Sequence, residues 1–227
     1  MSSPTPTGCS SARRELLSWA AGLGAVSAEA LARSRQVSCA CARSLLSAAV
    51  RDRQMRSWRL LSGEPALYTL TARGLRHAAI TGLAPVHLGP GGARHAGACC
   101  AAAVSLAAAF PQCEVLGEPA LRRRERELGG PLAVLGAAGG HGARAHRPDL
   151  LLVPATSVDG LPVAVEVELT VKAPQRLAAV CLAWARSRAV AGTLYLAAPE
   201  VLAPLGRAIA KAGAGERVIA LPLPPLR

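Results

Sequence analysis

Residues 163–172 read VAVEVELTVK, and this stretch decides how the second half of the chain is interpreted. Side chains alternate between the two faces of a strand, so Val163, Val165 and Val167 share one face while Glu166 and Glu168 share the other. The two carboxylates then lie roughly 7 Å apart along the strand. Like charges at that spacing repel unless a cation compensates them. The stretch therefore predicts a core strand whose second face lines an acidic groove.

Charged residues on either side of this strand suggest what compensates the glutamates. Asp149 begins the apolar run LLLV, and the turn dipeptide Asp159-Gly160 separates this run from residues 163–172. We therefore expect an antiparallel strand pair with Asp149 near the glutamates. A bound divalent ion is the usual solution for carboxylates gathered in a groove, and Lys172 follows closely in the sequence. A solvated strand face carrying two glutamates explains the same pattern without a metal.

The rest of the second half alternates between helical and strand patterns. We expect helices over residues 95–110, 174–188 and 199–212, a strand over 192–197 and a last strand in RVIALPL. His141 and His146 lie in a glycine-rich stretch just before Asp149. This order predicts an α/β domain with helices packed on a mixed sheet.

The first half has the order of a winged helix. Helical patterns begin at Arg13, after Ser27 and at about Ser38, and an expected β-hairpin around residues 62–65 precedes a helix capped by Thr71. In a winged helix the third helix enters the major groove of DNA, and the hairpin lies along the backbone. In that third helix we place Ala42, Leu45, Leu46, Ala49 and Val50 inward. The expected DNA-binding residues are Arg35, Arg43, Ser47, Arg51, Arg56 and Arg59.

The charge of the chain favours a polyanionic partner. The 227 residues carry a formal net charge of +12, and residues 1–82 hold eleven Arg against four acidic residues. A basic surface attracts phosphates and releases their counterions on contact, which favours a polyanion as the partner. An arginine-biased composition with a solvated basic face, or a winged helix used for protein contacts, explains the same excess.

Cysteine spacing and apolar run lengths indicate a reducing, non-membrane setting. The seven cysteines form no CxxC pair, so a zinc site is not expected and reduced thiols favour a cytoplasmic location. The apolar run over residues 96–110 is shorter than the roughly 20 residues that a membrane span needs. We divide the chain into a disordered N-terminus (1–11), a winged-helix domain (12–82), a linker (83–94) and a second domain (95–227).

The whole order resembles a known family. The Arg147-Pro148-Asp149 motif, the hairpin and the Glu166-x-Glu168 pattern with nearby Lys172 resemble the PD-(D/E)xK nuclease fold. Together with the N-terminal winged helix, the stretches GEPALRRR, RPDLLLV, VAVEVELTVKAPQRL and TLYLA are similar to the replication-relaxation family of plasmid and conjugative-element proteins. The similarity covers about residues 12–225. It implies a winged-helix DNA-binding domain joined to a restriction-endonuclease-like mixed-sheet domain, α/β (α+β) in class.

The resemblance also implies a chemistry and a set of residues. Asp149, Glu166 and Glu118 would hold Mg²⁺ or Mn²⁺, Glu168 stands where the common nuclease pattern has Lys, and Lys172 would supply the missing charge. The implied function is replication, relaxation or mobilisation of plasmid DNA, with nicking or cleavage by the second domain. The alternative is a non-catalytic regulator whose second domain dimerises or clamps DNA. Implied partners are double-stranded DNA, a second copy of the chain and replication or mobilisation proteins, with no membrane.

Overall fold

The computed structural model describes residues 7–135, 146–155 and 160–224, and the chain divides into two compact units. The N-terminal unit is Met1–Cys100 and the C-terminal unit is Ala101–Arg227. Helices and two sheets confirm the mixed α/β class. The boundary falls inside the helix α5 (Pro90–Ala109), so the end of the expected 83–94 linker is helical.

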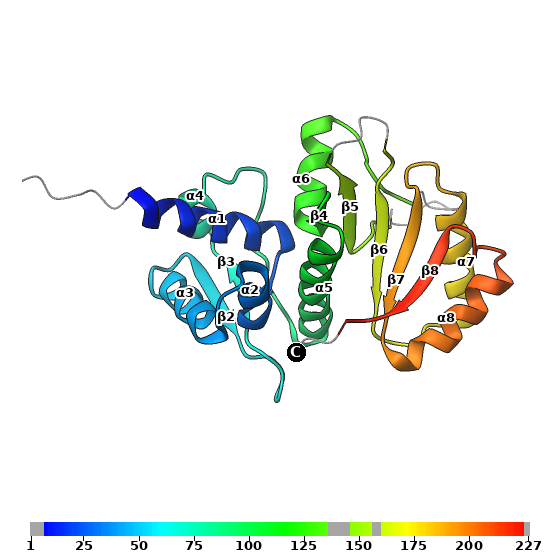
Figure 1. The fold of residues 1–227 in the computed structure, drawn as a ribbon, viewed down its shortest axis with the longest axis horizontal. Helices are drawn as coiled ribbons and strands as arrows, with labels where there is room; N and C mark the ends of the chain where they lie inside the picture. The colour runs from blue at the N-terminus through cyan, green and yellow to red at the C-terminus, as the bar shows by residue number, and fades with distance from the viewer. Residues whose placement is uncertain (1–6, 136–145, 156–159, 225–227) are drawn as a thin grey trace, which may run out of the picture. The chain divides into compact units, whose positions relative to one another are not determined.

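The N-terminal unit contains three helices, a hairpin and a further short helix before α5 (Figure 1). Its elements are α1 (Thr7–Leu23), β1 (Val26–Ser27), α2 (Ala28–Arg35), α3 (Cys39–Arg51), β2 (Met55–Trp58), β3 (Leu67–Leu70) and α4 (Ala72–His77). Strand β3 pairs antiparallel with both β1 and β2. Helix α1 begins at Thr7, inside the stretch 1–11 that we expected to be disordered, and residues 1–6 lie outside the described residues.

Local side chains set the ends of the N-terminal helices. The Ser27 hydroxyl accepts a hydrogen bond from the Ala30 amide and caps α2, and Ser38 caps α3 in the same way. Gln36 adopts the left-handed conformation, with φ at 53°, and ends α2. Only residues 36–38 therefore separate the two helices, a turn length typical of a helix-turn-helix pair. Thr71 caps α4, as we predicted.

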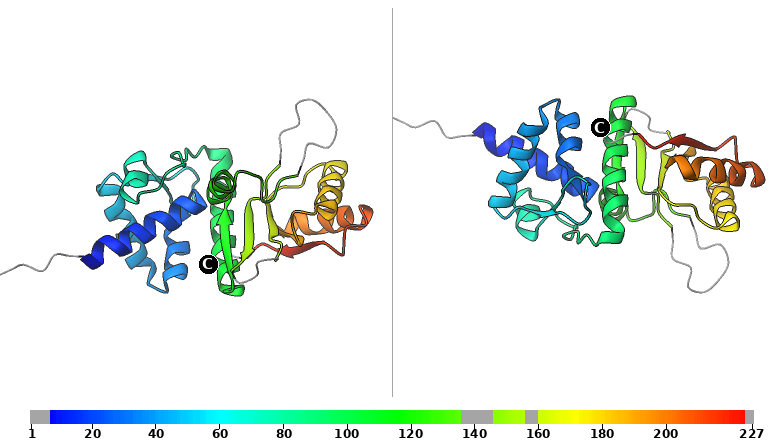
Figure 2. Two further views of the ribbon diagram at one scale, coloured as in Figure 1. Left: turned by 90° about the horizontal axis from the view of Figure 1, so that it is seen from above. Right: turned by 90° about the horizontal axis from the view of Figure 1, so that it is seen from below.

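The C-terminal unit is built on a five-stranded sheet in the order β4-β5-β6-β7-β8 (Figure 1). The strands β5 and β6 pair antiparallel, as the sequence predicted, and β6, β7 and β8 run parallel. Helices α7 and α8 pack against each other beside the sheet (Figure 2). The bounds are β4 (Cys113–Gly117), α6 (Glu118–Leu128), β5 (Leu150–Pro154), β6 (Val163–Glu168), α7 (Pro174–Arg186), β7 (Gly192–Ala197), α8 (Pro199–Lys211) and β8 (Val218–Pro222).

Strand β6 is the centre of this sheet, and both of its faces are buried. Glu166 is 7% exposed and Glu168 is 6% exposed, values like those of the valines on the opposite face. The glutamates that we expected to line an acidic groove are therefore enclosed, and helix α7 brings Trp184, which is 0% exposed, into hydrogen-bond contact with Glu166. The buried cluster also contains Leu177, Cys181, Tyr195, Val201 and Leu205.

Candidate functional site

A stripe of polar side chains runs along the outer face of α3. Arg43, Ser47 and Arg51 are four residues apart, a spacing that places them on one helix face, and all of them are exposed. The opposite face packs inward through Ala42, Leu46 and Ala49. Leu45 is 40% exposed, so our placement of this residue in the core is wrong. It follows Cys41 by one turn and shares that residue's exposed side.

The other expected DNA-binding residues surround this helix within the N-terminal unit. Arg35 ends α2, Arg56 lies in β2, and Arg59 opens the loop that joins β2 to β3. All are exposed. The Arg56 guanidinium lies 4.5 Å from the centroid of the Trp58 ring, which holds it flat against the hairpin.

These arginines differ in how their charges are compensated. Arg35 lies 3.3 Å from a carboxylate oxygen of Glu15, and both side chains are exposed. Among the described residues, no carboxylate lies within ion-pair distance of Arg43, Arg51, Arg56 or Arg59. Arg43 donates one hydrogen bond from Nε to the Cys39 carbonyl, which leaves its terminal nitrogens available. The N-terminal unit therefore presents uncompensated positive charge.

The C-terminal unit holds the acidic residues that the sequence analysis singled out, and Glu166 is the most enclosed of them. Its Oε1 atom lies 2.6 Å from His146 Nε2 and accepts a hydrogen bond of 2.9 Å from Trp184 Nε1. Burial raises the pKa of Glu166, and the hydrogen bond with His146 opposes that shift. The same hydrogen bond raises the pKa of His146, whose side chain is 46% exposed. The buried Glu166 carboxylate and the half-exposed His146 imidazole therefore form a hydrogen-bonded pair.

Glu168 and Asp149 are also engaged by neighbours from their own unit. Lys172, four residues after Glu168, forms an ion pair with its Oε2 atom. Asp149 Oδ2 accepts a hydrogen bond of 2.8 Å from the Val167 backbone amide, so its carboxylate is bound to the strand between the two glutamates. Lys172 lies in the connection between β6 and α7.

Glu118 lies at the start of α6, directly after Gly117, which pairs with Leu150. Asp149 immediately precedes Leu150, so both acids stand at the same end of the β4–β5 ladder. The Glu118 carboxylate accepts a hydrogen bond of 3.0 Å from Arg122 Nε, one turn along the helix.

We tested whether these carboxylates fit a divalent ion. Their oxygens have the hard-ligand chemistry that Mg²⁺ prefers, and Mg²⁺ requires those oxygens in a near-octahedral shell. Asp149, Glu166, Glu168 and Glu118, all of them described, do not bring three ligand oxygens within 4.8 Å of one another. Glu166, Glu168 and Glu118 pair with His146, Lys172 and Arg122 instead. As arranged, Glu118, Glu166 and Glu168 are paired within the protein and do not form a set of three metal ligands with Asp149.

Sequence reasoning missed several residues of this cluster. It gave His146 little weight and Trp184 none, because the hydrogen bonds to Glu166 join elements that are 20 and 18 residues away in the chain. It also missed the pair between Arg147 Nε and Glu125 Oε2, 2.8 Å apart, in which Glu125 is 7% exposed. The sequence did contain a signal for this pair, because Glu125 lies one turn after Leu121 on the buried face of α6. His141 lies outside the described residues.

Comparison of the chain with family models, with curated proteins and with solved structures gave no match. Over the described residues, every helix is too short or too polar to cross a bilayer.

Proposed function

We propose that this protein binds double-stranded DNA through its N-terminal unit, which acts as a winged-helix module. In this proposal α3 enters the major groove, and the β2–β3 loop lies along the sugar-phosphate backbone. The observation that carries the proposal is the exposed Arg43–Ser47–Arg51 stripe, whose arginines have no carboxylate within ion-pair distance among the described residues. An arginine without an internal partner can form bidentate hydrogen bonds to a guanine edge or to a phosphate without first breaking an ion pair.

The order of elements supports the same docking mode. A three-residue turn joins α2 to α3 and holds α3 against α2. Helix α3 buries only its inner face. Its outer face is therefore free for the groove within this unit, and Arg56 and Arg59 extend the positive charge onto the hairpin. The resemblance to the replication-relaxation family extends the proposal to replication, relaxation or mobilisation of plasmid or other mobile-element DNA.

A second candidate function concerns the C-terminal unit, as a non-catalytic module for dimerisation or DNA clamping. The observation that favours it is the internal pairing of the acidic residues: Glu166 with His146 and Trp184, and Glu168 with Lys172. DNA nicking with Mg²⁺, which the family resemblance implies, requires these carboxylates to be released from their present partners. A partner for clamping or dimerisation needs no such release.

The proposal is tested by removing the stripe. The double variant Arg43→Ala/Arg51→Ala is expected to weaken binding of a short labelled duplex by roughly 10-fold to 100-fold, because each arginine contributes one base or phosphate contact. Fluorescence anisotropy at several salt concentrations measures both the affinity and its salt dependence. The dependence of log affinity on log salt should become shallower by about one unit for each phosphate-binding arginine that is removed.

The matched control is the double variant Arg73→Ala/Arg76→Ala. It removes the same charge from α4, which packs on α1, and both arginines are exposed. We expect this control to retain affinity within about threefold, through loss of long-range attraction alone. Equal weakening by the two double variants would show that net charge, and not α3, determines binding.

A further inference from the structure

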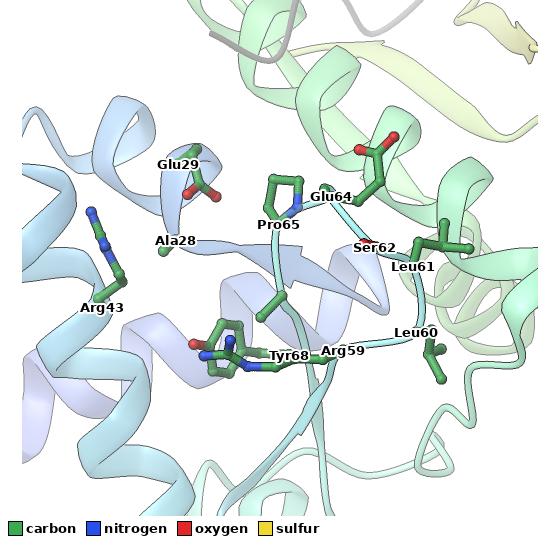
Figure 3. Close-up of a pocket in the computed structure, with 12 residues that line it drawn as sticks. Ala28, Glu29, Arg43, Arg59, Leu60, Leu61, Ser62, Glu64, Pro65 and Tyr68 are labelled. Carbon is green, nitrogen blue, oxygen red and sulfur yellow. The ribbon is translucent and has the colours of Figure 1, made fainter.

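A groove in the N-terminal unit lies between α3 and the β2–β3 loop. Its volume is about 590 Å³, within the range of small-molecule sites in proteins. Arg43 from α3 and Arg59 from the loop line it, with Tyr68 of β3 and Glu29 of α2 (Figure 3). In Figure 3 the Arg59 side chain extends from the loop across Tyr68 towards α3. The groove thus joins the expected recognition helix to the expected wing.

The charges in this groove are unequally compensated. Glu64 lies 3.8 Å from Arg94, so its charge is partly compensated outside the groove. One oxygen of Glu29 contacts the Cys39 thiol, and the other is buried with no hydrogen-bond partner among the described residues. Neither Arg43 nor Arg59 has a carboxylate at ion-pair distance in the described part of the chain. Two guanidinium groups without a carboxylate partner among the described residues therefore line this groove, together with the carboxylate of Glu29.

Apolar side chains form most of the remaining walls. Leu60 and Pro65 contribute from the loop, and the Tyr68 ring contributes from the strand beneath it. A ligand that fits must therefore carry a compact anionic group for the arginines and a ring or sugar for these walls. Guanidinium groups bind phosphate oxygens through paired hydrogen bonds, and sugars and bases pack on aromatic and proline surfaces.

We propose that this groove is a phosphate-ester site in which Arg43 and Arg59 hold the phosphate and Leu60 and Pro65 support the adjoining sugar or base. The source of the ester is either the DNA backbone, which rests on the function proposed above, or a free nucleotide. The recognition chemistry is the same for both sources. A nucleotide bound here competes with DNA, because both ligands need the same two arginines.

The test is a titration of the full chain with adenosine monophosphate, and separately with a short duplex, followed by amide chemical shifts in NMR spectra. We expect adenosine monophosphate to shift the amides of residues 59–68 and of Arg43. The variant Arg59→Ala is expected to lower its affinity at least tenfold, and Arg59→Lys to restore part of it, because Lys keeps the charge but loses the planar fork. Arg59 is exposed and forms no ion pair with a described residue, so its substitution leaves the fold intact.

Two further variants test whether charge within the groove, and not charge elsewhere in the unit, determines the affinity for adenosine monophosphate. Glu29→Gln removes a negative charge from the groove wall while keeping the side-chain shape, and it is expected to raise the affinity for adenosine monophosphate about twofold to fivefold. Arg73→Ala removes a positive charge from α4 and should leave that affinity unchanged. A site that depends on overall charge would respond to Arg73→Ala as strongly as to Arg59→Ala, and this result would overturn the proposal.

The two titrations separate the possible failures. If adenosine monophosphate shifts no amide of residues 59–68 while the duplex binds through α3, the groove proposal is wrong and the DNA-binding proposal stands. If the nucleotide binds the groove and the duplex does not bind, the DNA-binding proposal is wrong and the groove proposal stands. Shifts of the same amides by both ligands assign the groove to the DNA backbone phosphate as well. Nucleotide shifts in the groove that the bound duplex does not reproduce assign it to a free nucleotide.

Discussion

The buried acidic residues of β6 and α6 and the exposed arginines of α3 and the β2–β3 loop differ in how their charges are compensated. In the C-terminal unit, buried acids are matched one by one: Glu166 with His146, Glu168 with Lys172, and Glu125 with Arg147. In the N-terminal unit, Arg43, Arg51 and Arg59 stand exposed, with no carboxylate at ion-pair distance among the described residues. Charge that is compensated inside the fold mainly supports the fold, whereas uncompensated surface charge is available to a partner.

This contrast changes how the acidic pattern of β6 is interpreted. Two glutamates on a central strand first suggest a cation from outside the protein. The structure supplies compensation from within, through an imidazole, an indole and an ammonium group. A solvated basic face would also explain the arginines of α3. These arginines are nevertheless better evidence for an external ligand than the glutamates of β6, because they have no carboxylate partner among the described residues.

The largest effect that separates the two units is expected from Arg147→Ala. Among the described residues, this change leaves the buried Glu125 carboxylate with the Leu132 amide alone, and it should lower the free energy of unfolding of the C-terminal unit by about 3 kcal/mol. Urea unfolding of the full chain, followed by tryptophan fluorescence and near-ultraviolet circular dichroism, measures this decrease. DNA affinity should stay unchanged under conditions in which the variant is folded.

The exposed pair within α6 provides the control for that prediction. Arg122→Ala breaks the Arg122–Glu118 pair, in which both side chains are about half exposed. Such helix pairs contribute about 0.3–0.5 kcal/mol, so the change should be hardly detectable. If Arg122→Ala and Arg147→Ala cost the same, burial does not determine the value of these pairs.

A smaller effect is expected from pH. The pKa values of His146 and Glu166 are both raised in the folded protein, so both groups hold protons more tightly there than in the unfolded chain. Their stabilising contribution is complete below the unfolded pKa values and is lost as pH rises through the folded ones. Thermal unfolding of the C-terminal unit should therefore shift to lower temperature as pH rises above the ordinary pKa of a glutamate, about 4.3, and further as it rises above that of a histidine, about 6.5.

The double variant His146→Gln/Glu166→Gln removes both titrating groups and should flatten this pH profile. Calorimetric scans of the two proteins across the same pH range provide the comparison. A profile with the same slope in the double variant would assign the pH dependence to other residues.

Regular elements were predictable from sequence because each follows from local pattern. Alternation in VAVEVE predicted β6, and the serines before α2 and α3 predicted their starts. The Glu168–Lys172 pair could also be predicted, since its partners are four residues apart in the sequence. The burial of Glu166 was not, because Trp184 reaches it only after α7 packs on the sheet. The groove beside α3 was also hidden, since it depends on how the β2–β3 loop folds over Tyr68.

The central claim is that the N-terminal unit contacts DNA through uncompensated arginines, and hydrogen–deuterium exchange of the full chain with and without a short duplex tests it most directly. The account predicts slower exchange in peptides that cover α3 and the β2–β3 loop. Peptides that cover β6 and the connection to α7 should be unchanged. Protection confined to residues 146–172, with none in α3 or the loop, would contradict the account and return the acidic cluster to the centre of function.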